Sequence, residues 1–436
     1  MPDPTKPDHA TPDHATPDHA APDHTTPDHP LPDRAILTGV PDLWRPARRP
    51  ELADRLVSRR TGPVIRVEET APEQGGAWRV AVAGASVDRV HPAVRPATGG
   101  SRAPSRDEAR RKAFSEFAER LVLQEPPYPT GSPASDGDCP LTTMPLHVRE
   151  LATGDTRVHP AAGYYLHPAS CPLAGRSDRP SSNGAAAGES YWQAVERGLL
   201  ELLERDALMT TWRYGLRPPR LSPAGFADDE TEELLRRGFR LSLVNLSAAH
   251  GIPTVVCLLR GRVDGRADGQ AVATVGSAAD RTLSRAVARA AGEAVSVLEA
   301  CAHHLASGPS GELALDDFVE HAFHYLDPGR IGLLDRLDSA TAVDSEAPEL
   351  AGDSRTLVEE IAAGLAAREI SVYAADLTPP WLAAMGTRTV VTRSPDLYPL
   401  ELGHGSPALA GRLARHASRR ALVDATRVHL EPVPLA

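Results

Sequence analysis

The sequence of 436 residues lacks several features by which common protein classes are recognised. Its four cysteines, Cys139, Cys171, Cys257 and Cys301, form no CxxC pair and have no partner at structural zinc spacing, so we expect reduced thiols. Aromatic residues make up only 4% of the chain, yet 41% hydrophobic and 24% charged residues are ordinary for a soluble globular protein. The composition argues against a fibrous protein.

The chain also lacks a surplus of positive charge and any long apolar run. Its formal net charge of −11 disfavours a protein that neutralises the phosphates of a nucleic acid. No stretch approaches the roughly 18 apolar residues that mark a membrane span, and the N-terminus does not resemble a secretion signal. We therefore expect a cytoplasmic protein whose partners include neither nucleic acid nor membrane.

Familiar catalytic motifs are missing as well. The sequence contains no GxxxxGK[ST] phosphate loop, no GxGxxG, no HExxH and no GxSxG elbow. Any ATP site in this chain must therefore be built in another way.

The N-terminal residues repeat with a period of five. Asp recurs from Asp3 to Asp33 next to proline, and His follows five of these aspartates. Frequent proline blocks a helix, and few apolar side chains are present to offset the entropy of ordering. Weak transition-metal binding is one interpretation, but a solvated extension is the preferred one. We expect residues 1–34 to form a disordered tail without a catalytic role and residues 35–436 to form one domain.

Strand and helix patterns interleave along the rest of the chain. Residues 78–87 alternate as in a strand, and residues 105–123 predict a helix with Ser105 and Glu108 as a capping box. A longer helix is expected over residues 188–212, with an apolar stripe along one face and charged residues opposite. Further strands are expected over 156–167, 240–246, 253–259, 271–275, 369–377 and 387–393, and a helix over 282–305. Without a strict βαβ rhythm, the order favours a mixed α/β (α+β) domain over a Rossmann unit.

One charged pattern occurs twice within these helices. Glu116, Glu119 and Arg120 form an ExxER motif, and Glu201, Glu204 and Arg205 form a second one. Positions i, i+3 and i+4 share one face of a helix. Two such helices facing each other would offer four carboxylates for Mg²⁺ ions that also bind nucleotide phosphates, and the arginines could contact phosphate.

A purely structural alternative is that ExxER marks a solvated helix surface with i,i+4 ion pairs. The second copy, however, follows Ser182-Asn183-Gly184-Ala185-Ala186-Ala187-Gly188, which we interpret as a glycine-rich loop opening straight into the helix. Backbone amides and the dipole at a helix N-terminus favour an anion. Loop and motif together favour an ATP site.

These segments resemble the YcaO family. SSNGAAAGESYWQAVERGLLELLERDAL (181–208) is similar to the central segment of that family, and AFSEFAERL (113–121) is similar to its earlier ExxER helix. Val275-Gly276-Ser277 before the helix that contains Glu293 resembles the next ATP-site helix, and residues 376–378 and 394–397 resemble the C-terminal strands. The resemblance implies a fold whose helices surround ATP and Mg²⁺ without a Walker motif.

The resemblance also implies roles for single residues. The metal or nucleotide ligands would be Glu116, Glu119, Glu201, Glu204 and Glu293, and further contacts to ATP would come from Arg102, Arg120, Ser182, Asn183 and Arg205. The terminal sequence EPVPLA is similar to the proline-rich C-terminus of azoline-forming members, which makes Ala436 the candidate catalytic residue.

Four positions depart from the family pattern. Lys112, Gln193 and Ser296 stand where the family usually has Ser, Glu and Gln, and Ser101-Arg102-Ala103 replaces Gly-Lys-Gly. Arg102 is expected to substitute for that lysine. Lys112 is interpreted equally well as a phosphate contact and as an exposed helical lysine. His303 and His304 are interpreted as packed or solvated histidines rather than metal ligands.

The implied reaction is ATP-dependent activation of a peptide backbone amide. The preferred substrate is a ribosomally made precursor peptide and the preferred product is an azoline, with thioamide and amidine formation as alternatives. We expect a separate partner protein that binds the leader peptide. The oligomeric state stays open, with a homodimer among the alternatives. A family member that binds without turnover and acts as a scaffold is the rival interpretation.

Overall fold

The computed structural model describes most of the chain beyond the N-terminal repeat, all of it within the compact unit Pro50–Ala436. The described residues are 52, 56–57, 63–72, 77–84, 97–126, 140–166, 181–223, 226, 229–263, 269–308, 313–315, 318–338, 349–402, 411, 413, 416 and 428–435. The prediction for residues 1–34 falls outside them. Within this part of the chain no helix is both long and apolar enough to cross a membrane.

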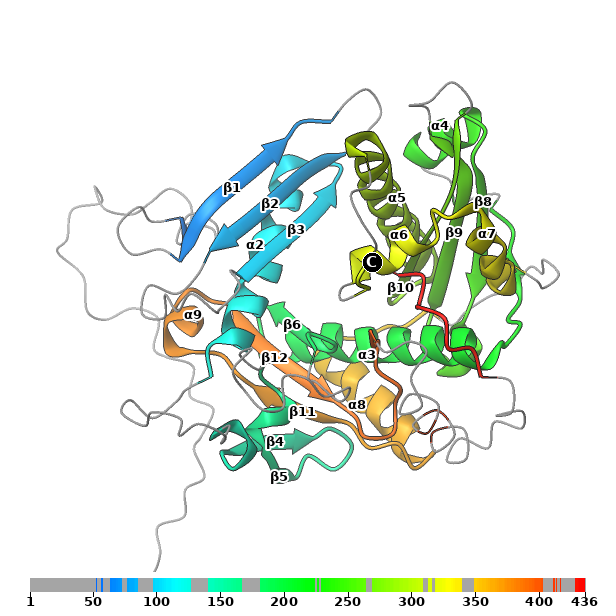
Figure 1. Cartoon of the computed structure of the whole chain (residues 1–436). Coiled ribbons are helices and arrows are strands. Elements are labelled where there is room, and N and C mark those ends of the chain that lie inside the picture. The colour runs from blue at the N-terminus through cyan, green and yellow to red at the C-terminus, as the bar shows by residue number, and fades with distance from the viewer. Residues whose placement is uncertain are drawn as a thin grey trace, which may run out of the picture. The chain divides into compact units, whose positions relative to one another are not determined.

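Three antiparallel sheets form the framework of the described residues (Figure 1). The first sheet contains β1 (Val64–Thr70), β2 (Trp78–Gly84) and β3 (Ala97–Ala103) in chain order. The second has the order β10-β9-β8-β7, with strands Gln270–Ala279, Thr254–Val263, Arg240–Asn245 and Arg220–Leu221. The third has the order β5-β4-β11-β12-β6, with strands Thr156–Pro160, Pro145–Glu150, Tyr373–Asp376, Arg388–Arg393 and Ala185–Gly188.

Three long helices pack on these sheets. Helix α2 (Arg106–Gln124) packs on β2 and β3 and also contacts β6. Helix α3 (Tyr191–Tyr214) contacts β6, β12 and β10, so it touches two of the sheets. Helix α5 (Leu283–Ser307) packs on β9 and β10. The remaining helices are α4 (Asp229–Arg236), α6 (Phe318–His324), α7 (Pro328–Ile331), α8 (Ser354–Ala366) and α9 (Pro380–Ala384).

The mixed fold class predicted from the sequence is confirmed, and most expected elements are present. Ser105 caps α2 by accepting a hydrogen bond from the Glu108 amide, as the capping box predicted. The boundary of the next helix was wrong, because Ala185–Gly188 is strand β6, paired with β12, and α3 starts only at Tyr191. The expected strand over 156–167 ends at Pro160, which has no amide to continue the ladder, and a short 3₁₀ turn follows.

Helix α3 also differs from its predicted amphipathic form. The sequence predicted one apolar stripe opposite a charged face, whereas most side chains of α3 are buried, including the carboxylates of Glu196 and Glu204. Buried charged groups need partners, since an unpaired one would be costly. The polar residues of this central helix therefore need binding partners from other elements.

Candidate functional site

The two predicted carboxylates of α2 are held by backbone amides of neighbouring strands. Glu116 Oε2 accepts a hydrogen bond of 2.7 Å from the Gly100 amide of β3, and Glu119 Oε1 accepts one of 2.6 Å from the Ala187 amide of β6. Arg120 pairs with Glu116 at 2.6 Å and donates to Thr98 of β3. Each carboxylate is thus fixed in direction while keeping lone pairs for another ligand.

The carboxylates of α3 and α5 meet at a single strand. Ser277 of β10 donates its hydroxyl to Glu204 and its amide to Glu293, both at 2.6 Å. The Ala279 amide also donates to Glu204, at 3.0 Å. Strand β10 therefore joins the second ExxER motif to α5, which sequence spacing alone could not reveal.

Glycines allow the strands to approach the helices this closely. A Cβ on Gly99 would lie 2.1 Å from the Ala113 carbonyl oxygen of α2, and a Cβ on Gly276 would lie 2.3 Å from the Ala290 carbonyl oxygen of α5. Each glycine directly precedes the residue whose amide binds a carboxylate, Gly100 or Ser277. The same arrangement therefore fixes Glu116 of α2 and Glu293 of α5.

The five glutamates form an electrostatically connected row. The pKa of Glu119 is raised to about 8, first by burial and then by the charges of Glu116 and Glu201, against the Ala187 hydrogen bond. The pKa values of Glu201 and Glu293 are raised to about 7, first by burial and then by the charge of Glu204, against the charge of Arg205. Neighbouring negative charge and partial removal from water are the conditions under which a cation binds favourably.

The guanidinium of Arg205 lies within this row. It contacts Glu201 and Glu204 at 3.8 Å, and the charge of Glu293 acts on it as well. Its Nε and Nη1 are buried and have no hydrogen-bond partner among the described residues. A buried guanidinium with unused donors suits the oxygens of a phosphate group. The residues present therefore fit a nucleotide whose phosphates are bridged to carboxylates by Mg²⁺.

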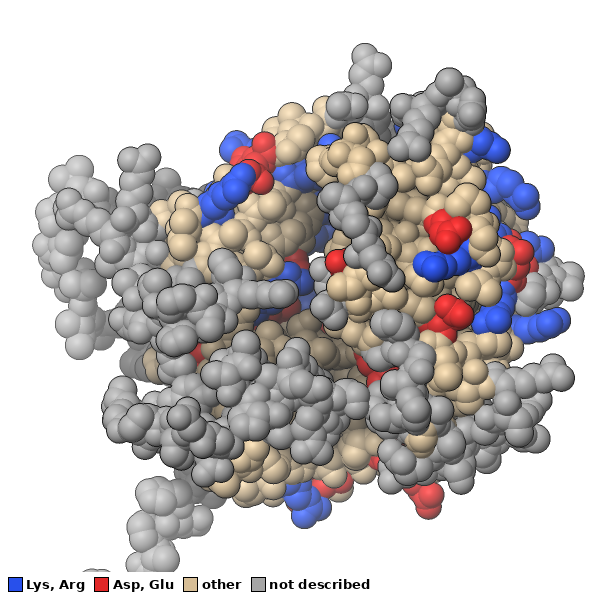
Figure 2. Space-filling model, in the orientation of Figure 1, with Lys and Arg blue, Asp and Glu red and all other residues tan. Residues whose placement is uncertain are grey.

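No three His, Cys, Asp or Glu side chains among the described residues converge tightly enough to ligate one metal ion by themselves. Mg²⁺ usually takes one or two carboxylates and completes its shell with water and substrate phosphates, so a Mg²⁺ site does not require three such side chains on one ion. Figure 2 shows that the face drawn there is hollowed, with acidic and basic residues visible inside the hollow.

The segment that was expected to be a glycine-rich loop is instead a tight turn followed by strand β6. Gly184 has φ of +67°, a conformation that favours glycine, and its carbonyl accepts hydrogen bonds from Thr392 of β12. Asn183, a predicted ATP contact, is buried and donates to the Leu400 carbonyl at 2.7 Å. Ser182 is exposed at the turn. In this structure the Asn183 side chain stabilises the turn.

Arg393 is a residue that the sequence reasoning missed. Its guanidinium donates to the carbonyl oxygens of Ser181 and Asn183, and also to that of Gly163. Burial lowers the pKa of Arg393 to about 10, although Tyr164 and Glu201 oppose the shift. The residue stood at the end of a predicted strand without any local motif, so only the three-dimensional structure shows that it holds this turn.

The positions that depart from the family pattern mostly have structural partners. Lys112 is exposed and pairs with Glu108 at 2.7 Å, as expected of a surface lysine. Gln193 and Ser190 cap α3 reciprocally, since the Gln193 amide donates to Ser190 and the Glu189 amide donates to Gln193. Ser296 donates to the Gly292 carbonyl within α5. Arg102 lies 3.6 Å from Glu299 of α5.

The proposed catalytic residue, Ala436, lies outside the described residues, but the segment before it is anchored. Val433 and Leu435 are fully buried. Arg213 of α3 donates to the carbonyl oxygens of His429 and Glu431, at 3.0 and 2.6 Å, and Tyr325 donates to that of Pro432. The C-terminal segment is thereby tied to the helix that carries Glu201, Glu204 and Arg205.

Comparison with known proteins identifies this architecture. A family model described as YcaO cyclodehydratase, ATP- and Mg²⁺-binding, matches residues 133–397, more than half of the chain. The cofactors of the family are thus ATP and Mg²⁺, as the sequence predicted. An uncharacterized protein in the tfuA 3' region of Rhizobium leguminosarum bv. trifolii is 34% identical over 96 residues, which are 19% of this chain and 23% of that protein.

Solved structures share the fold at low identity. A heterocyclase in complex with substrate and cofactor aligns with a TM-score of 0.64 and 17% identity, covering 88% of this chain and 56% of its own. YcaO from Methanopyrus kandleri, bound with AMPPCP and Mg²⁺, aligns with a TM-score of 0.53 and 19% identity over 85% of this chain and 90% of its own. The E. coli microcin synthetase McbBCD complex with pro-MccB17 bound aligns with a TM-score of 0.56 and 14% identity over 78% and 90%.

This chain thus spans little more than half of the heterocyclase and about a quarter of the Rhizobium protein. At these identities the solved structures establish the fold alone. The matching family model, the three-helix carboxylate row and the antiparallel framework agree with one another. The chain belongs to the YcaO family.

Proposed function

We propose that this protein uses ATP and Mg²⁺ to activate a backbone amide of a ribosomally made precursor peptide, with cyclodehydration of Cys, Ser or Thr to an azoline as its preferred reaction. The observation that carries the proposal is the row of Glu116, Glu119, Glu201, Glu204 and Glu293 around the buried guanidinium of Arg205. Family membership supports the reaction class.

The proposed reaction solves the problem of a poor leaving group. A Cys, Ser or Thr side chain adds to the preceding amide carbon, and the amide oxygen then takes the γ-phosphoryl group of ATP, releasing ADP. The attacking side chain loses its proton as the ring closes; the oxygen then departs as inorganic phosphate, and the amide nitrogen loses its proton as the C=N double bond of the azoline forms. Overall, peptide and ATP give azoline, ADP and phosphate, with the amide oxygen transferred into the phosphate.

The residues of this chain would contribute by positioning and electrostatics. Bound Mg²⁺ would neutralise charge that develops on the transferred phosphoryl group. Glu201, Glu204 and Glu293 would hold the Mg²⁺, and Arg205 would donate hydrogen bonds to phosphate oxygens. The partly buried site would strengthen these interactions by keeping water away.

A second candidate is a family member that binds nucleotide or peptide without turnover and serves as a scaffold in a modification complex. The observation that favours it is the structural use of departing residues, since Gln193 serves as a helix cap and Ser296 bonds within α5. The amide-held carboxylates argue against a scaffold that has lost metal binding, because such a protein would have no physical need for them. Thioamide or amidine formation would use the same site with a different nucleophile.

The test is co-expression with candidate precursor peptides and their partner proteins, followed by mass spectrometry. An azoline is expected to remove the mass of one water per ring, and heavy oxygen placed in the peptide amide should appear in phosphate. ATP turnover with no transfer of the label would contradict amide phosphorylation. Magnesium-dependent ATP binding with no turnover for any peptide would favour the scaffold.

A further inference from the structure

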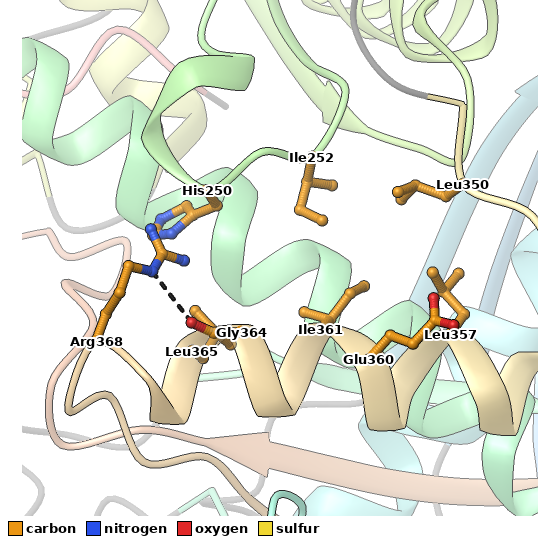
Figure 3. Close-up of a pocket in the computed structure, with 9 residues that line it drawn as sticks. All are labelled: His250, Ile252, Leu350, Leu357, Glu360, Ile361, Gly364, Leu365 and Arg368. Carbon is orange, nitrogen blue, oxygen red and sulfur yellow. Dashed lines mark hydrogen bonds between the residues drawn. The ribbon is translucent and has the colours of Figure 1, made fainter.

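A cavity of about 310 Å³ lies between α8 and the segment that joins β8 to β9 (Figure 3). Its walls are mostly apolar, formed by Ile252, Leu350, Leu357, Ile361 and Leu365. The volume is at the lower end of the roughly 300–1,000 Å³ typical of small-molecule sites. None of the candidate nucleotide ligands lines it, so the cavity is distinct from the site described above.

One end of this cavity is basic. Arg368, just beyond the C-terminus of α8, donates to the Ala249 carbonyl at 3.1 Å, which places its guanidinium beside His250 (Figure 3). The His250 side chain is only 1% exposed, and its Nε2 lies 2.8 Å from Asp206 Oδ2. Its Nδ1 is buried without a hydrogen-bond partner among the described residues. His250 is thus fixed by Asp206, and Arg368 is the charged group that an anionic ligand would meet at this end of the cavity.

The other end of the cavity is acidic, and the middle is open. Glu360 lies at the end away from Arg368 and His250 in Figure 3. Between them Gly364 forms part of the wall, and nothing lies within 4 Å of the position that a Cβ would occupy there. An anionic head group would therefore be attracted to Arg368 and repelled by Glu360, while an aliphatic body contacts the leucine and isoleucine side chains.

We propose that this cavity is a binding site for a small aliphatic carboxylate. The carboxylate accepts hydrogen bonds from the Arg368 guanidinium, which lies beside His250. The aliphatic part fills the space beside Gly364. A free short-chain acid and the C-terminal aliphatic residue of a peptide offer the same chemistry.

The location links the ligand to the helix that carries the second ExxER motif. Asp206, which holds His250, directly follows Arg205 in α3 and also accepts a hydrogen bond of 2.7 Å from the Tyr398 amide. The ligand would therefore lie one buried His–Asp pair away from α3. The proposal itself concerns binding and does not depend on the reaction that the enzyme catalyses.

The experiment is a titration of the full chain with hexanoate and with N-acetyl-leucine. Binding is monitored by nuclear magnetic resonance of the ligand or by calorimetry. Hexanol and N-acetyl-leucine amide serve as uncharged counterparts. We expect saturable binding of at least one carboxylate. Its uncharged counterpart should bind at least about tenfold more weakly, because the charge-assisted hydrogen bonds are lost. Tighter binding of N-acetyl-leucine indicates a peptide end, and tighter binding of hexanoate indicates a free acid.

Three variants locate the site. Gly364→Leu fills the open space and should abolish binding, and Arg368→Gln should weaken it about tenfold or more. Arg355→Gln, on the same helix but outside the cavity lining, is the control and should bind as wild type. Lack of saturable binding by both carboxylates, or unchanged binding in Gly364→Leu, would overturn the proposal. Magnesium-dependent ATP binding measured on the same samples reports separately on the nucleotide site.

Discussion

At the residue scale, the candidate glutamate ligands of α2 and α5 are oriented by backbone amides of neighbouring strands. Gly100, Ala187 and Ser277 donate their amides to Glu116, Glu119 and Glu293. The sequence could place the glutamates on helix faces, because i, i+3 and i+4 spacing depends only on local geometry. It could not identify the amide donors, since these belong to strands far away in the chain.

The raised pKa values lead to a pH dependence of metal binding. Glu201 and Glu293 have pKa values of about 7 and Glu119 of about 8, so these groups are largely protonated in the metal-free protein below neutral pH. Mg²⁺ requires the carboxylate form. We expect affinity for Mg²⁺ and ATP to rise between pH 6 and pH 8.5, with release of protons, in calorimetry with buffers of different ionisation enthalpy.

The same pKa values determine how the stability of the metal-free protein changes with pH. The folded-state pKa values exceed the ordinary glutamate value of about 4.5, so the stability contributed by the protonated carboxyls is fully present below that pH and is lost as pH rises from there through about 7 to 8. The urea midpoint of metal-free protein should therefore fall over this interval. Affinity that is constant with pH, and no proton release, would contradict the carboxylate assignment.

At the scale of secondary-structure elements, the site depends on close contacts between strands and helices. Gly276 of β10 lies so near α5 that a Cβ would approach the Ala290 carbonyl and the Ala294 amide to 2.3 and 2.4 Å. The sequence showed Val275-Gly276-Ser277 only as a family resemblance, and the contact explains physically why glycine is required there. The same close packing at Gly99 of β3 supports α2.

Gly276→Ala is expected to destabilise the fold by about 1–3 kcal/mol, because backbone atoms of α5 must move to accept the methyl group. The shift should also displace Ser277 and weaken ATP binding. Gly292→Ala on α5 is the matched control, since nothing lies within 4 Å of its Cβ position and alanine favours a helix by about 0.5–1 kcal/mol. Urea unfolding and ATP calorimetry measure both effects. Equal stability of the two variants would show that the close contact is unimportant.

The predicted start of the central helix was wrong because of pairing between secondary-structure elements. Residues 185–188 are three alanines and a glycine, which locally suit a helix as well as a loop. Pairing with β12 makes them a strand, and Ser190 then becomes the N-cap of α3. Tertiary pairing overrode local propensity, as it often does for short segments of small residues.

At the scale of the whole molecule, the C-terminal segment is held by contacts from α3 and from the residue after α6. Trp212 and Arg213 donate to carbonyl oxygens of residues 429–431, and Tyr325 donates to Pro432. The proline-rich ending was visible in the sequence, but its partners lie more than a hundred residues earlier. Long-range contacts of this kind leave no periodic signal in the sequence.

Arg213→Met tests this anchor. The variant keeps an apolar side chain in the buried space but loses two hydrogen bonds from a charged group, which together should cost about 1.5–3 kcal/mol or more. We expect carboxypeptidase to remove the C-terminal residues faster than from wild type, as followed by mass spectrometry. Arg217→Met, at an exposed position beyond α3, is the control. Digestion of Arg213→Met at the wild-type rate would mean that other contacts hold the segment.

Carboxylates from α2, α3 and α5 would together hold Mg²⁺ and ATP in the proposed enzyme. The most direct measurement is calorimetric titration of ATP into the full chain, with and without Mg²⁺, for wild type, Glu201→Gln and the surface control Lys112→Gln. We expect magnesium-dependent binding by wild type and Lys112→Gln and a loss of about 10–100-fold or more in Glu201→Gln, because a metal ligand is removed. Wild-type affinity in a folded Glu201→Gln variant would contradict the claim.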